Sequence, residues 1–214
     1  MSVSLPDGST LAIASTYGTG FTVSAITNAN PGVATLSSSH GVATGDFFEI
    51  TSGWPRLNNR IIKAGTVATN DVPLTGVNTS STATYPAGAG TGTGREITGW
   101  QTITQVLDLT SSGGDQQFVN YSFLDSKDEF QIPSVRSPIQ IQFRIADDTS
   151  AAHFVVLQAA DDDRLQRAIR LTLPSGAIIL YNAIVTVGQT PSMSKGQVMS
   201  IPVTASLQAI PTRY

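Results

Sequence analysis

Few side chains of this sequence could carry out catalysis, and their spacing matches no known catalytic motif. The two histidines are His40, in an expected turn before Gly41, and His153, on the flank of an expected helix. A Ser-His-Asp triad needs an exposed serine, and the Gly-x-Ser-x-Gly elbow that would expose one is absent. Cysteine is absent too, which excludes thiol catalysis, thiolate metal sites and disulfide bonds. We therefore expect no catalytic residue and no cofactor, with a hydrolase that uses one histidine as the weakest alternative.

A cluster of three carboxylates invites a metal-binding hypothesis. Asp161, Asp162 and Asp163 follow the expected helix, where negative charge opposes the helix dipole. Calcium would relieve that repulsion, although no Asp-x-Asp-x-Asp-Gly loop accompanies the cluster. The alternatives are a solvated turn balanced by Arg164 and Arg167, or an acidic surface that faces a partner or a lumen. We predict no metal site here.

Alternate glycines between residues 88 and 94 superficially resemble a phosphate-binding loop. Such a loop needs a following helix and a Lys-Ser/Thr pair to aim donors and a cation at phosphate, and the sequence provides neither. The range 75–94 contains almost no large apolar residue. We therefore expect it to be a flexible connector or a long surface loop.

Composition excludes several classes of function. The 214 residues include 40% apolar but only 13% charged residues, about half the usual charged share. The net charge is −3 with no basic run, so phosphate-driven binding of nucleic acid is not expected. Few charges are typical of β proteins that pack against copies of themselves, because a buried unpaired charge is costly. The sequence shows neither a secretory signal nor a membrane-spanning stretch, so we expect a soluble protein made in the cytoplasm.

Periodic elements that could position functional side chains are concentrated in the last part of the chain. Apolar and polar residues alternate over 139–145 and again over 199–209, which is typical of strands with one buried face. Between these strands, the range 151–160 has apolar residues at helical spacing, and Asp148 before it offers a capping oxygen. We expect one α-helix that flanks a β-sheet and ends before Asp161.

The first half of the chain has a different organisation. Between residues 18 and 98, about five short apolar runs are separated by turn residues, which indicates a small β-barrel or β-sandwich. Strand patterns flank this range on both sides. We expect a mainly β protein: a β-sandwich or barrel domain with one flanking helix, formed by residues 1–17 and 99–214, and an inserted small all-β domain at 18–98 with its glycine-rich connector.

An irregular region from residue 111 to 138 carries more aromatic and large apolar residues than a solvated loop would. Its acidic tip has Asp125, Asp128 and Glu129 around Lys127. Such a region either forms a hairpin of its own or lies on another molecule.

The order of these elements resembles the tail tube proteins of bacteriophages with long, non-contractile tails. The likeness covers roughly residues 97–214 and the N-terminal strand, and the range 18–98 is the departure from it. Three short motifs carry it: the acidic element Ser122–Ser126 in the long loop, the turn Leu173–Gly176 before a strand with Tyr181, and the segment Lys195–Met199 that leads into the last strand.

This resemblance implies a structural subunit of the virion tail that forms hexameric rings, stacked into a tube. The tube would surround the tape measure protein, contact other tail proteins and later conduct DNA without binding it specifically. Assembly would take place in the host cytoplasm, without membrane insertion. The long loop would reach a neighbouring ring and make the inter-subunit contact through Asp115, Phe118, Tyr121, Phe123, Leu124, Asp125 and Lys127.

A second class of function remains open from the sequence. The chain could be a β-sandwich binding module or adhesin of a phage particle that recognises carbohydrate or a host surface. Trp54 or Trp100, together with Tyr85, would then form a flat aromatic platform for a sugar.

Overall fold

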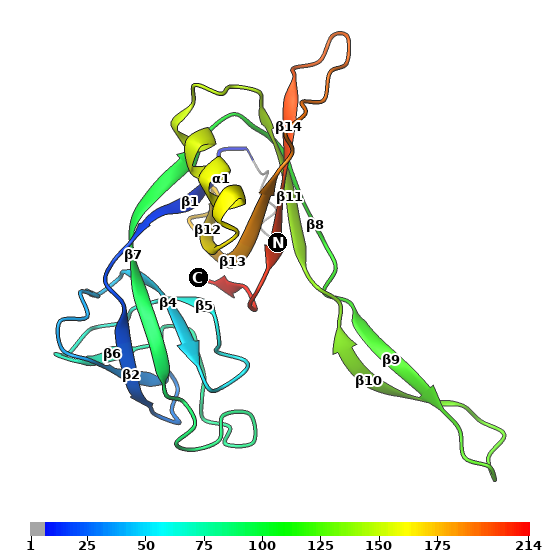
Figure 1. Ribbon diagram of the computed structural model, residues 1–214. Helices are drawn as coiled ribbons and strands as arrows, with labels where there is room; N and C mark the ends of the chain where they lie inside the picture. The colour runs from blue at the N-terminus through cyan, green and yellow to red at the C-terminus, as the bar shows by residue number, and fades with distance from the viewer. Residues whose placement is uncertain (1–6) are drawn as a thin grey trace.

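The protein is mainly β with one helix, as expected from the sequence (Figure 1). A computed structural model describes residues 7–214. The elements are β1 (Thr10–Tyr17), β2 (Phe21–Ile26), β3 (Val33–Leu36), β4 (Phe47–Ser52), β5 (Arg60–Lys63), β6 (Asp71–Pro73), β7 (Gly92–Ile103), β8 (Val106–Ser112), β9 (Gln116–Tyr121), β10 (Phe130–Arg136), β11 (Gln140–Ala146), α1 (Ala152–Asp163), β12 (Gln166–Thr172), β13 (Ile178–Val187), β14 (Ser200–Leu207) and β15 (Thr212–Arg213).

An antiparallel sheet with the order β7-β1-β12-β13-β14-β11-β8 forms the body of the molecule. Apolar and polar residues alternate along β11 because one face of the sheet is buried: Ile141, Phe143 and Ile145 are at most 3% exposed. They face Ala205, Val203 and Ile201 of β14 in register. Both predicted strands are confirmed, and α1 packs against β13, β1 and β7 to close the apolar core.

Helix α1 differs in detail from the sequence prediction. It extends to Asp163 and so includes the three aspartates that we expected to end it, and Arg164 follows in the left-handed conformation with φ 53°. The Asp163 carboxylate makes an ion pair with Arg167 and accepts a hydrogen bond from the Leu165 amide. Asp148 does not cap the helix, because its carboxylate accepts hydrogen bonds from the amide and hydroxyl of Ser150.

His153 is buried in the core, not on the helix flank where the sequence placed it. Its side chain is among the buried polar groups at 2% exposure, and Nδ1 lies 3.3 Å from the Thr104 hydroxyl. The other ring nitrogen, Nε2, has no partner in the protein. Burial lowers the pKa of His153, and nearby Asp148 offsets this only in part.

We predict that His153 makes the fold less stable in acid. Its pKa in the folded protein lies below the value near 6.5 of an unfolded chain, so the unfolded state binds more protons as the pH falls below about 6.5. The free energy of unfolding should therefore fall more between pH 7.5 and 5 in the wild type than in His153→Gln, measured by urea denaturation. Equal losses in the two proteins would contradict the prediction.

Residues 18–98 fold around an apolar cluster of their own. Strands β2 to β6 and the first half of β7 enclose it, and its largest member is the fully buried Trp54. Strand β7 joins the strands of this segment to those of the body in one continuous sheet: Gly94 pairs with β2 and β4, and Trp100 pairs with β1.

The glycine-rich tract is a surface loop over residues 75–91, as expected, but its last part is not. Gly92 and Gly94 are residues of β7, and each lies so close to the neighbouring strands that a side chain would collide with the backbone. Gly90 is buried against the Trp54 ring, where an added Cβ would come within 3.0 Å of ring carbons. These glycines allow close packing of strands, a role that composition alone does not distinguish from flexibility.

Candidate assembly surfaces

The predicted contact loop is an antiparallel hairpin that extends away from the body (Figure 1). Strands β9 and β10 pair only with each other among the described strands. A two-stranded hairpin is marginally stable on its own in water. The hairpin is anchored at its base, where Asp115 and Ser137 exchange backbone and side-chain hydrogen bonds of 2.9–3.4 Å.

One face of the hairpin is apolar and open to solvent. Because Tyr121 faces Phe130 and Val119 faces Ile132, these four side chains share a face. They are 36–58% exposed, and Phe123 stacks edge-on against Tyr121 with ring centroids 5.5 Å apart. A contiguous apolar surface of this kind marks an interaction site in a soluble protein.

The structure gathers only part of the predicted contact set on this face. Tyr121 and Phe123 belong to it, while Phe118 is in register with Pro133 and so lies on the opposite face. Leu124, Asp125 and Lys127 occupy the exposed connection between the strands. The sequence interpretation missed Val119 and Ile132, although the alternation of apolar residues at 119, 121, 130 and 132 could have revealed them.

A second exposed surface covers the outer side of β8, β11 and β14, and we call it the polar sheet face. It carries uncharged residues apart from Arg144 and Asp108, whose side chains form an ion pair 2.6 Å long. The hydrogen bond from Arg144 lowers the pKa of Asp108, so both groups are ionised at neutral pH and their charges cancel. The members are Asp108, Thr110, Gln140, Gln142, Arg144, Thr204 and Ser206.

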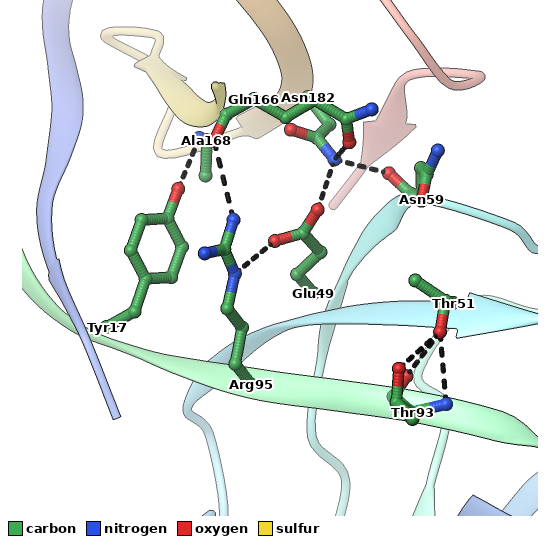
Figure 2. A network of polar contacts seen from close by, with 9 residues as sticks. All are labelled: Tyr17, Glu49, Thr51, Asn59, Thr93, Arg95, Gln166, Ala168 and Asn182. Atoms are coloured by element: carbon green, nitrogen blue, oxygen red, sulfur yellow. Dashed lines mark hydrogen bonds and ion pairs between the residues drawn. The ribbon is translucent and has the colours of Figure 1, made fainter. Parts of the chain in front are cut away.

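A buried polar network fixes residues 18–98 against the body (Figure 2). The Glu49 carboxylate is 6% exposed and accepts hydrogen bonds from Arg95 Nε at 2.6 Å and Asn182 Nδ2 at 2.8 Å. The Asn182 amide also donates to the Asn59 carbonyl. Beside this contact, within the body, the Tyr17 hydroxyl accepts a hydrogen bond from the Ala168 amide. Paired charges in such a site fix geometry, because removing one partner leaves the other buried and unsatisfied.

The last residue strengthens the same junction. The Tyr214 hydroxyl accepts a hydrogen bond from the Lys63 amide at 2.8 Å and donates to the Thr75 carbonyl at 3.1 Å. Burial raises the pKa of Tyr214, so this hydroxyl stays protonated at neutral pH. The segment 18–98 therefore packs against the face of β1, β12 and β13 that is turned away from α1, where Ala14, Ala168 and Leu180 are buried in one cluster with Ile61.

The prediction of an aromatic platform for sugar binding is wrong. Trp54 is completely buried and Tyr85 is 8% exposed, because the two rings pack edge-on inside the cluster of residues 18–98. Trp100 lies at the junction with the body, stacked under the Arg170 guanidinium and beside Phe47.

The remaining sequence candidates lie apart from these surfaces. His40 Nε2 lies 3.0 Å from the Thr69 carbonyl, and Nδ1 accepts a hydrogen bond from the Val42 amide. Within residues 7–214, no group of three His, Cys, Asp or Glu side chains is arranged to hold a metal ion.

Over residues 7–214, the body sheet, its one helix and the projecting hairpin with its exposed apolar face define a mainly β protein with a surface suited to association. The sequence model of the family described as phage tail tube protein, TTP, matches residues 52–214, and the chain belongs to this family. No curated protein matches the chain. The match begins within the 18–98 segment, so it includes β5, β6 and β7 as well as the body.

Membership identifies the protein as a structural component of the virion tail that assembles with other copies and tail proteins. Within the described part of the chain, no helix is both long and apolar enough to span a membrane.

Proposed function

We propose that this chain is a non-catalytic subunit that assembles into hexameric rings, stacked into a tube through which DNA enters the host. The tube surrounds the tape measure protein during assembly in the host cytoplasm. Family membership supports the tail role, and the exposed apolar face of the β9–β10 hairpin is the single observation that supports self-association most strongly. A surface of this kind becomes stable when a second copy covers it.

In this proposal the hairpin contacts the neighbouring ring. The apolar residues Tyr121 and Phe123 become buried there, since removal of apolar area from water is the main favourable term in protein association. Phe118, on the opposite face of the hairpin, meets another part of the same neighbour. Asp115 secures the base, while Leu124, Asp125 and Lys127 lie at the leading end.

We also propose that the polar sheet face lines the channel. Phosphates are held mainly by lysine and arginine, and the one arginine of this face is neutralised by Asp108 at 2.6 Å. DNA would therefore pass without a fixed contact. The segment 18–98 is in this proposal an inserted domain on a parent domain of residues 1–17 and 99–214.

The test is to remove the aromatic pair of the hairpin and examine assembly by negative-stain electron microscopy. Purified wild-type protein should form rings or tubes, and Tyr121→Ser combined with Phe130→Ser should abolish stacking. The Tyr121 and Phe130 side chains pack against each other, and the hairpin pairs with none of the described body strands. The thermal unfolding of the body should therefore be unchanged.

Val155→Ser is the matched control, since Val155 is 66% exposed on the outer side of α1. It should assemble like the wild type. A wild-type protein that stays monomeric at high concentration, or a double variant that stacks normally, would overturn the proposal.

A further inference from the structure

The loop between β13 and β14, residues 188–199, lies at the end of the body sheet opposite to the hairpin (Figure 1). The register requires this arrangement. Ala146, at the far end of β11, pairs with Ser200 where the loop enters β14, while Gln140 pairs with Ser206 and Ser112 next to the hairpin. Seven residues of strand, about 20 Å, therefore separate the two features.

This β13–β14 loop has an exposed apolar surface of its own. Met193 is 71% exposed, Val198 64% and Met199 48%. A bridge between Ser192 and Ser200 closes the base of the loop and holds these side chains outward. Methionine side chains adapt to irregular partners and make favourable contacts with aromatic rings.

The β13–β14 loop and the hairpin tip carry net charges of opposite sign. Lys195 is the only charged residue of the loop. The hairpin tip, residues 122–129, has three carboxylates and one lysine. None of these charged side chains forms an ion pair within residues 7–214, so each is available for a partner of opposite sign.

We propose that the β13–β14 loop of one copy is the docking site for the hairpin tip of a second copy. This inference rests on the proposed stacking function and identifies the surface that receives the hairpin. A head-to-tail contact needs two different surfaces that face opposite directions, and these two features lie at opposite ends of one sheet. The apolar residues Met193 and Val198 meet Phe123 and Leu124, and Lys195 meets the acidic tip.

Disulfide trapping tests the contact directly, because the natural chain has no cysteine to compete. A Met193→Cys protein is mixed with a Leu124→Cys protein under assembly conditions and oxidised with diamide. Covalent heterodimers should form in the assembled material. In the control, Val155→Cys replaces Met193→Cys, and trapping should fall at least about tenfold because the helix surface lies away from the contact. Equal trapping in both mixtures, or none in material that assembles, would overturn the inference.

Charge reversal gives an independent measurement. Lys195→Glu and Asp125→Lys should each raise the critical concentration for assembly about two- to fivefold, as loss of an exposed ion pair does. The two changes together in one chain should restore much of the loss, because each loop then meets a tip of opposite charge. Additive losses without recovery would refute the pairing. If the wild type itself fails to assemble, the proposed function fails. If the wild type assembles and only the pairing tests fail, the hairpin docks on another surface and this inference is wrong.

Discussion

Replacing Trp54 by alanine is expected to destabilise the protein by about 3–5 kcal/mol, the range for truncation of a large buried aromatic side chain. The indole is 0% exposed and packs edge-on against Tyr85 with ring centroids 5.1 Å apart. Its Nε1 donates a 2.8 Å hydrogen bond to the Pro86 carbonyl. The variant loses this bond together with the packing, so the glycine-rich tract that lies on the indole should open first.

Urea denaturation measures the total loss, and hydrogen exchange at residues 86–91 measures the local opening. Trp54→Phe is the matched control, because it keeps a ring in the cavity and removes the N–H donor, at an expected cost of about 1–2 kcal/mol. The sugar-platform hypothesis predicts the reverse: unchanged stability and loss of retention on a carbohydrate column. That result would contradict the buried position of the indole.

The strands of the body could be predicted from sequence because their burial follows from local alternation. Every second residue from Ile141 to Ile145 faces the core, and the same holds from Ile201 to Ala205. A period of two identifies the buried face without knowledge of the partner strand. The same pattern is present at 119–121 and 130–132, but the eight residues between these short runs carry no tight-turn motif, so a hairpin was only one of two alternatives for this region and its strands were not assigned.

Other features depend on contacts between distant parts of the chain and could not be predicted. Trp54 is buried because the tract before β7 folds back over it, a contact across more than thirty residues. The three aspartates remain helical because the Leu165 amide and Arg167 engage Asp163 just beyond the helix end. Glu49 and Asn182, separated by 133 positions, meet only after the segment 18–98 packs on the body.

The base of the hairpin offers a way to move this contact element while keeping its surface intact. Gly113 and Gly114 join β8 to β9, and both adopt positive φ, 82° and 84°. A side chain at Gly113 would collide with the backbone carbonyl of Pro138, which cannot rotate away as a flexible side chain can. Gly113→Ala should therefore shift the hairpin relative to the body.

Gly113→Ala is expected to raise the critical concentration for assembly at least about tenfold, which corresponds to about 1.4 kcal/mol per contact. The clash adds to the cost of about 1–2 kcal/mol for an L-residue in the left-handed region. Gly176→Ala is the matched control, since Gly176 has φ 84° but open space around its Cβ position. The control should show the backbone cost in unfolding experiments and normal stacking in electron micrographs. Both variants have the backbone strain, but only Gly113→Ala also has the collision. A loss of stacking in Gly113→Ala alone would show that assembly depends on the direction in which the hairpin points. Equal stacking in both variants would show that this direction is not critical.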